Sequence, residues 1–216
     1  MIPGVTASAK WRRGVAPEPA LPTIPGEPFG GGFYAGDIQY PNGQWYKLII
    51  ADVASKVTGE NSRWKVVNTF TPATGDQVDG MANTQAMIAE DIDLHPAAKH
   101  IINHRGGGFA DWYMPAKDEL NVIYTNLGPN RPNSPPHYKL GGSQFLTSGW
   151  FWSSTQYSAE NSWMQAMGEG IQTSGIFVSY KNGIILHAIP IRRVPFYPLP
   201  HSVSDPSTHH RTGSPP

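Results

Sequence analysis

The chain has 216 residues, of which 39% are hydrophobic and 15% are charged, and its net charge at pH 7 is zero. This length suffices for one substantial core, and the balanced charge excludes the basic face of a nucleic-acid-binding protein. Because the chain has no cysteine, disulfide scaffolds, thiolate metal sites and cysteine nucleophiles are excluded as well. The 23 glycines and 21 prolines exceed average usage and indicate many turns, as in all-β or α+β proteins.

Residues 1–28 are predicted to form a proline-rich N-terminal arm. The prolines in its second half are spaced two or three residues apart, which prevents a helix and favours an extended chain. Two interpretations stay open for the arm: a disordered linker, or a segment that lies along a neighbouring subunit. In the second case we expect Trp11, Arg12 and Arg13 to be the docking residues.

The globular part is expected to begin with a β-hairpin. Two runs rich in apolar and aromatic residues, 33–40 and 44–52, flank a Pro-Asn-Gly segment, and the Asn-Gly pair favours a tight two-residue turn. We expect one strand in each run and a short third strand within 62–70.

Helices are predicted for the middle of the chain. Asp79 is a suitable N-cap for a helix over 79–90, and the segment 95–104 either extends this helix or forms a second short one that begins at Pro96.

The clearest helical pattern covers 114–128. Pro115 suits a first turn, and Asp118 and Glu119 lie near the positive end of the helix dipole. Apolar residues then recur on one face, and Gly128 ends the helix.

After a long irregular loop over 129–145, the pattern returns to strands. We expect them within 151–155, 161–168, 170–180 and 183–194, and the Lys-Asn-Gly segment at 181–183 predicts a hairpin that pairs the last two. The predicted organisation is therefore an arm over 1–28, a domain over 29–196, and a tail over 197–216 rich in proline, serine and histidine.

No motif of catalysis or metal binding is complete. His95, His100 and His104 fall on or near one helix, but the glutamate of a zinc-protease motif is missing, so we favour a solvated helix face over a metal site. The glycine run of 105–109 lacks the context of a phosphate-binding loop and is interpreted as a turn between helices. We therefore expect no enzyme, no cofactor and no metal, and a hydrolase with an acid–base pair in a deep pocket is the weaker alternative.

Aromatic residues are the strongest indication of a binding function. They are concentrated in the predicted strands at the end of the chain: Trp150, Trp152, Tyr157, Trp163, Phe177 and Tyr180. Strand alternation places Phe151 on one face and Trp152 on the other, and we expect Trp152 and Trp163 in the core. Ser153, Ser154 and Thr155 are expected to satisfy buried backbone groups. The loop 156–161 is then expected to face outward, because a tyrosine among serine, asparagine and glutamine is typical of binding surfaces.

Three ordered segments carry a resemblance: GGGFADWYMPAKDELNVIYTNL, FWSSTQYSAENSWMQAMGEGIQ and IPIRRV. Together they resemble the Lcl-type C-terminal domain of bacterial adhesins and phage virion proteins, over about residues 30–195. The matching residues are Gly108, Phe109, Asp111, Trp112, Pro115, Asp118, Glu119, Leu120, Trp152 to Thr155, Trp163, Gln165, Arg192 and Arg193.

The resemblance implies an α+β, C-type-lectin-like fold, in which two helices pack on a twisted antiparallel sheet. Relatives of that fold include formylglycine-generating enzymes, but their cysteines are absent here, so that activity is not expected. The Glu-Pro-Asn motif of calcium-dependent sugar binding is absent as well.

Two functions follow as hypotheses. The first is a phage tail or fibre protein that binds a host surface glycan or protein through the ligand-binding residues Tyr157, Glu160, Asn161, Gln172 and Tyr180. The second is a decoration or cement protein of the capsid or tail, whose proline-rich arms lie on neighbouring subunits.

Both hypotheses imply other virion proteins as partners, and a homo-oligomer, with a trimer suggested only by analogy with phage fibres. The N-terminus lacks the continuous apolar run of a signal peptide, and no run of about 18 apolar residues predicts a membrane span. We expect assembly in the host cytoplasm and location in the virion.

Overall fold

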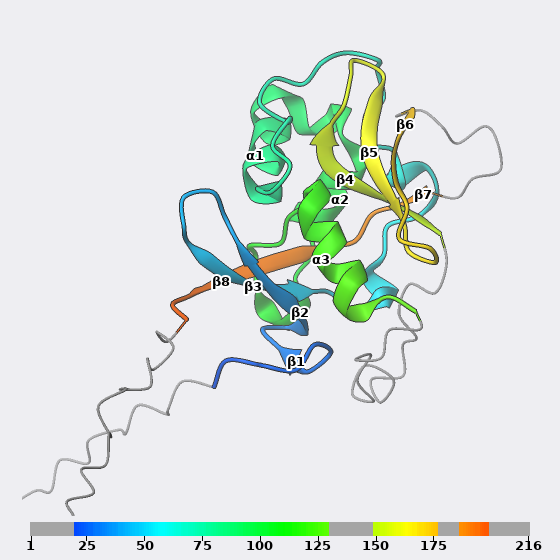
Figure 1. The fold of residues 1–216 in the computed structure, drawn as a ribbon. Helices are drawn as coiled ribbons and strands as arrows, with labels where there is room; N and C mark the ends of the chain where they lie inside the picture. Colours follow the sequence, from blue (N-terminus) through cyan, green and yellow to red (C-terminus); the bar gives the residue numbers. More distant parts are fainter. Residues whose placement is uncertain (1–19, 130–148, 177–185, 199–216) are drawn as a thin grey trace, which may run out of the picture.

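Three α-helices and two four-stranded β-sheets make up the part of the chain that the computed structural model describes, residues 20–129, 149–176 and 186–198 (Figure 1). The predicted α+β class is confirmed. The prediction of two helices on one sheet is corrected to three helices and two sheets. None of the helices in these ranges is long and apolar enough to cross a membrane.

The first sheet has the strand order β1-β2-β3-β8, and every neighbouring pair is antiparallel. Its strands are β1 (Pro28–Phe29), β2 (Gly32–Gln39), β3 (Trp45–Ile50) and β8 (Ile191–Phe196). The predicted hairpin is confirmed, since β2 and β3 are joined by a turn in which Gly43 adopts a φ of 83°. That positive φ is the conformation that makes Asn-Gly a hairpin signal.

The second sheet has the order β6-β5-β4-β7, and its β4–β7 pair is parallel. Its strands are β4 (Trp150–Gln156), β5 (Asn161–Ala166), β6 (Gln172–Ile176) and β7 (Leu186–His187). The Lys-Asn-Gly turn lies outside the described residues, and the pairing expected from it is not seen, because β6 and β7 lie at opposite edges of the sheet.

The run 183–194, predicted as one strand, contributes to both sheets. Beyond β7, Ala188 exchanges backbone hydrogen bonds with Val57, and Pro190 has no N–H with which to continue a ladder. The chain then enters β8, beside β3. The packing of two sheets therefore breaks this run into two strands. Its continuous apolar pattern does not indicate where the break lies.

The predicted helices are confirmed. They are α1 (Gly80–Asp91), α2 (Pro96–Ile102) and α3 (Lys117–Leu127), and single 3-10 turns lie at Val53–Ser55, Gly59–Ser62, Ile92–Leu94 and Gly106–Gly108. Asp79 caps α1 by accepting a hydrogen bond of 2.8 Å from Ala82 N–H. Pro115 precedes α3 and is not within its first turn, since Ala116 is the N-cap residue.

The predicted strand within 62–70 is wrong. Trp64 and Lys65 are both fully buried, and the Trp64 indole donates to the Ser153 carbonyl at 2.8 Å. Lys65 Nζ lies 2.7 Å from a Glu90 carboxylate oxygen, and Val66 N–H donates to the Leu94 carbonyl. Consecutive buried side chains anchor this segment to the helical layer, so it follows an irregular path instead of joining a sheet.

The cores lie on both faces of β4. Between the two sheets, the apolar face of α3 packs with Leu48 and Ile50 of β3 and with Phe151 of β4. On the other face of β4, Trp152 packs with Met87 of α1 and with α2 (Figure 1). Phe151 and Trp152 therefore point to opposite sides, as strand alternation predicted.

An ion pair between Arg192 and Asp111, called the clamp below, connects β8 to the segment that follows the 3-10 turn Gly106–Gly108. The Arg192 guanidinium donates to both carboxylate oxygens of Asp111 at 2.8 Å and to the Gly30 carbonyl at 3.0 Å. It also lies 3.6 Å from the centre of the Phe109 ring. Bidentate geometry of this kind makes an ion pair strong, and the Arg192 side chain is only 9% exposed.

Asp111→Asn is expected to lower the free energy of unfolding by about 2 kcal/mol, because it leaves the buried guanidinium without its counter-charge. Asp93→Asn is the matched control: the Asp93–Lys99 pair is solvent-exposed on both sides, so its loss should cost much less than the loss of the Asp111–Arg192 pair. Denaturant unfolding of the two variants measures the difference. Equal effects would show that the clamp contributes no more than a surface pair.

Candidate functional site

The loop between β4 and β5 carries three of the predicted binding residues and is held by its own hydrogen bonds. The backbone N–H groups of Tyr157 and Ser158 donate to the Asn161 carbonyl at 2.9 and 3.0 Å. The Ser158 hydroxyl accepts from Asn161 Nδ2 at 3.0 Å and from Glu160 N–H at 3.2 Å. Tyr157 is 58% exposed and Glu160 is exposed, whereas Asn161 is half-buried.

Gln156 differs from the expected outward orientation of this loop. Its side chain is buried, where its carbonyl accepts from Thr71 N–H at 2.7 Å and from the Thr74 hydroxyl at 3.0 Å. Gln156 thus ties the start of the loop to the segment before α1. The exposed part of the loop begins at Tyr157.

Trp163 was expected in the core, and the structure corrects this to a half-buried position on β5. Met164, the next residue, packs beside Trp152, so strand alternation turns Trp163 to the opposite face. There its ring centre lies 5.3 Å from that of Tyr157, with the ring planes at 79°, and 4.3 Å from Lys117 Nζ. An aromatic pair is therefore open to solvent at the start of α3.

Gln172 joins the same surface from β6. It lies opposite Gln165 in the β5–β6 ladder, and its side-chain amide donates to the Lys117 carbonyl at 2.8 Å. Lys117 Nζ in turn donates to the Gln77 side chain at 3.2 Å. We call the surface formed by Tyr157, Trp163, Lys117, Gln172 and Gln77 the aromatic face.

The structure thus gathers Tyr157 and Gln172 on one surface, with Glu160 and Asn161 in the adjoining loop. Tyr180, Trp11, Arg12 and Arg13 lie outside the described residues. Lys117 and Gln77 were not predicted as site residues. Lys117 contacts Trp163, which lies 46 residues later in the chain, and no sequence pattern indicates a contact over that separation.

The chemistry of the aromatic face suits a ring-shaped polar ligand. An exposed aromatic pair offers flat apolar surface, and the amide groups of the glutamines offer both donors and acceptors. A lysine beside a tryptophan adds a positive charge held over the ring. Stacking combined with amide hydrogen bonds is how a protein engages a sugar, which has an apolar ring face and polar edges.

The three histidines do not share one environment. His95 is fully buried, which corrects the expected solvated position, and its ring nitrogens lie 3.1 Å from the Trp64 carbonyl and 2.9 Å from Glu90. Burial lowers the pKa of His95 although the hydrogen bonds to Glu90 and Trp64 favour the charged form. Within the described ranges, no three histidine or acidic residues are grouped in a way that could hold a metal ion.

Glu119 is the most enclosed acidic residue, and its surroundings are those of a structural group. Its carboxylate accepts from the hydroxyls of Tyr40 and Tyr113 at 2.8 and 2.6 Å, and from Ala116 N–H and Gly80 N–H at 2.8 and 3.2 Å. Burial raises the pKa of Glu119 to about 7, although these donors favour the ionised form. Every acceptor direction is occupied by the protein itself, so Glu119 joins α1, α3 and the first sheet.

The comparisons with known proteins find neither a family model nor a curated protein that matches this chain. The candidate site is therefore inferred from the contacts and exposure of its residues alone.

Proposed function

We propose that this chain is a phage tail or fibre protein whose C-type-lectin-like domain binds a host surface receptor, with a glycan as the favoured ligand. The observation that carries the proposal is the aromatic face, where the Tyr157–Trp163 ring pair stays open to solvent beside Lys117 and Gln172. Within the virion, other structural proteins are the proposed partners, and assembly takes place in the host cytoplasm.

The internal contacts of the motif residues support the lectin-like part of the proposal. Asp111 pairs with Arg192, Glu119 bonds with Tyr113, and the Ser153 hydroxyl donates to the Trp163 carbonyl. These contacts join the glycine-rich segment, α3 and the strands at the end of the chain. Residues that lie far apart in the motif thus form one framework, and Trp163 connects this framework to the aromatic face.

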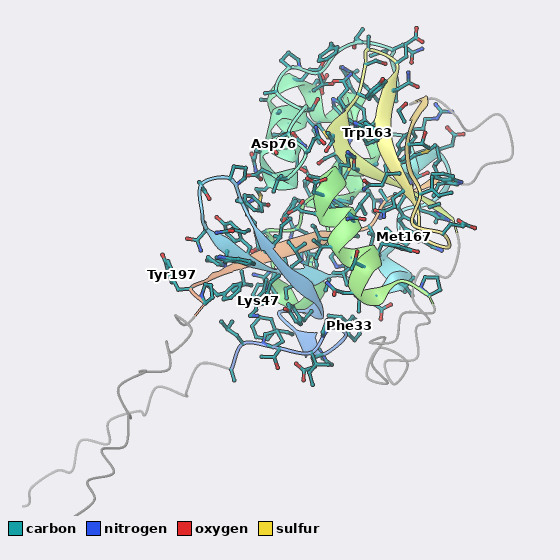
Figure 2. All side chains as sticks on the ribbon, in the orientation of Figure 1. Phe33, Lys47, Asp76, Trp163, Met167 and Tyr197 are labelled. Carbon is teal, nitrogen blue, oxygen red and sulfur yellow. The ribbon has the colours of Figure 1, made fainter. Side chains whose placement is uncertain are left out.

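The test is binding of the full-length protein to a panel of intact bacterial cells and to the surface polysaccharides purified from them. Tyr157→Ala is expected to weaken saturable binding about five- to thirtyfold, because stacking on an exposed ring contributes about 1 to 2 kcal/mol. Tyr197→Ala is the matched control. Tyr197 is 86% exposed and lies at the end of β8, far from Trp163 (Figure 2).

Tyr197→Ala should bind the cells within twofold of the wild-type protein. Unchanged binding by Tyr157→Ala would remove the aromatic face from the proposal. No saturable binding to any member of the panel would count against receptor recognition altogether.

A second candidate function is the cement protein, and a separate observation favours it. Exposed apolar side chains flank both ends of the described chain: Leu21 and Ile24 are 42% and 47% exposed, and Tyr197 is 86% exposed. In an assembled particle, neighbouring subunits would cover these side chains. Deleting residues 1–19 and 199–216 should then abolish incorporation into virions and leave cell binding intact, whereas a receptor-binding protein that docks otherwise would still be incorporated.

A further inference from the structure

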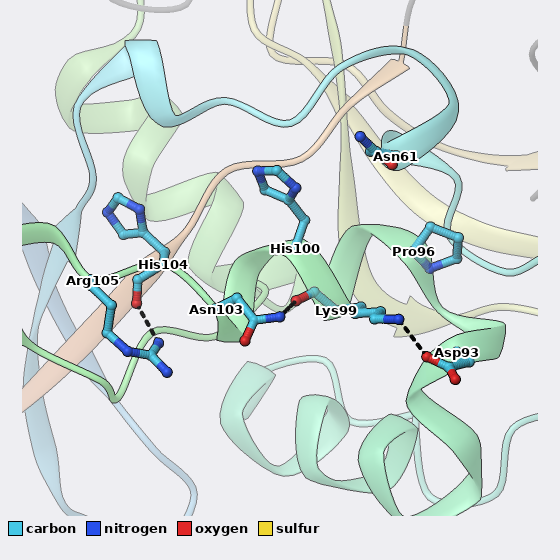
Figure 3. Close-up of a pocket in the computed structure, with 8 residues that line it drawn as sticks. All are labelled: Asn61, Asp93, Pro96, Lys99, His100, Asn103, His104 and Arg105. Atoms are coloured by element: carbon cyan, nitrogen blue, oxygen red, sulfur yellow. Dashed lines mark hydrogen bonds and ion pairs between the residues drawn. The ribbon is translucent and has the colours of Figure 1, made fainter.

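A groove lies beside α2 (Figure 3), and none of its lining residues belongs to the aromatic face. Its volume is about 570 Å³, which is within the range of pockets for small organic ligands. Asp93 and Pro96 come from the start of this helical segment, and Asn61 comes from the 3-10 turn at Gly59–Ser62. The lining residues are Asn61, Asp93, Pro96, Lys99, His100, Asn103, His104 and Arg105.

Positive groups outnumber negative ones in this groove. Lys99 and Arg105 carry permanent positive charges, and Asp93 is the single carboxylate in the lining. His100 and His104 add imidazoles that point to the same side of α2 (Figure 3). Because Lys99 is paired with Asp93, the charge of Arg105 leaves the groove with a net positive charge, which favours an anionic ligand.

The cationic side chains are held in place before any ligand binds. Lys99 Nζ lies 2.6 Å from Asp93, and Arg105 Nη1 donates to the carbonyls of Ile102 and His104 at 2.8 and 2.7 Å. The His104 ring packs edge-on against Trp112, with ring centres 4.8 Å apart. Pre-positioned side chains lose little conformational entropy on binding, which favours affinity.

The glycine run after Arg105 has a steric reason to be glycine. A Cβ on Gly106 would lie 2.5 Å from His104 Nε2, and a Cβ on Gly107 would lie 2.3 Å from the Gly31 Cα atom. Gly107 also adopts a φ of 63°, which side chains disfavour. The run therefore lets the chain turn tightly and keeps one edge of the groove, at His104, uncrowded.

Donors remain available in the groove. Both hydrogens of Arg105 Nη1 are used by carbonyls, whereas its Nε and Nη2 groups have no hydrogen-bond partner among the described residues. Burial lowers the pKa of His104, and the charges of His100 and Arg105 add to this effect. A lowered pKa favours the neutral imidazole, which offers one donor and one acceptor and so suits a hydroxyl group.

We propose that this groove binds an acidic saccharide, in which Lys99 and Arg105 bind a carboxylate or phosphate, and His104, Asn61 and Asn103 bind the sugar hydroxyls. The combination of a fixed guanidinium with neutral amide and imidazole groups matches a ligand that carries both charge and hydroxyls. The site is separate from the aromatic face, so the inference does not depend on the function proposed above.

The test is calorimetric titration of the full-length protein with three saccharide probes: oligogalacturonate, which carries carboxylates, phosphorylated dextran, which carries phosphates, and neutral dextran. At least one acidic probe should bind, with a Kd that rises as salt is added, and dextran should not. The preferred probe distinguishes carboxylate from phosphate recognition. The imidazole NMR signals of His100 and His104 should shift on binding.

The double variant Lys99→Gln/Arg105→Gln should bind the acidic probe at least tenfold more weakly. Since Arg105 also bonds the end of α2, the exposed single variant Lys99→Gln provides a second test, for which we expect a threefold or larger loss. Lys56→Gln, which removes a positive charge outside the groove, should bind like the wild-type protein. Equal binding of dextran, unchanged binding by the groove variants, or tighter binding of a single-stranded oligonucleotide would overturn the proposal.

Discussion

Glu119→Ala is expected to lower the free energy of unfolding at pH 7 by about 4 kcal/mol, the largest effect of any single substitution proposed for this protein. The variant would leave two tyrosine hydroxyls and two backbone N–H groups without their common acceptor, all of them buried around Glu119. It would also open a cavity between α3 and the first sheet. Chemical denaturation monitored by tryptophan fluorescence measures the loss.

Glu160→Ala is the matched control, because the Glu160 side chain is exposed and the change should cost less than about 0.5 kcal/mol. The pH dependence adds a second check. Burial raises the folded-state pKa of Glu119 to about 7, above an unfolded value near 4.5, so the stability from this group is full below pH 4.5 and is lost as the pH rises to 7. The deficit of Glu119→Ala should therefore be about 2 kcal/mol larger at pH 5 than at pH 8. A deficit below 1 kcal/mol at both pH values would contradict a structural role for this carboxylate.

We expect protonation of His187 to destabilise the fold in acid. Between pH 7 and pH 4.5, the free energy of unfolding of His187→Gln should fall by about 2 kcal/mol less than that of the wild-type protein. Burial, together with the charge of Lys56, lowers the pKa of His187 to about 4. The ring packs on Phe151 with centres 5.1 Å apart, and its Nδ1 atom has no hydrogen-bond partner in the described structure. Protonation would place a charge in this apolar setting.

The sign follows from linkage between proton binding and folding. The folded-state pKa lies below the unfolded value of 6.5, so the stability due to neutral His187 is present above pH 6.5 and is lost as the pH falls toward 4. Buried His95 acts in the same direction and Glu119 in the opposite one, so the informative quantity is the difference between wild type and variant at each pH. His100→Gln serves as the control, because the His100 side chain is exposed. Parallel stability curves for wild type and His187→Gln would rule out this role for His187.

Local patterns in the chain correctly predicted most of the secondary structure. Asp79 caps α1, Pro96 begins α2, and Asn42-Gly43 closes the β2–β3 hairpin, because caps, first turns and tight turns are decided by a few neighbouring residues. The alternation of Phe151 and Trp152 across β4 was likewise readable from the sequence, since a strand has a fixed period of two.

Contacts between distant segments could not be predicted in this way. Trp163 was predicted in the core because of its size and apolar character. It is half-buried on the outer face of β5, because Met164 occupies the face that packs against Trp152. His95 reads as a surface residue of a helix, yet its partners Trp64 and Glu90 enclose it.

The sequence by itself determined the α+β class, the three helices, the β2–β3 turn, and the polar loop that carries Tyr157, because each depends on interactions within a few residues. The tertiary structure alone decided that Lys117 and Gln172 meet Trp163, that four donors surround Glu119, and that Arg105 and His104 border one groove. These arrangements depend on how two sheets and three helices pack, and packing is selected by the shape and volume of the whole core. No spacing along the chain encodes that selection.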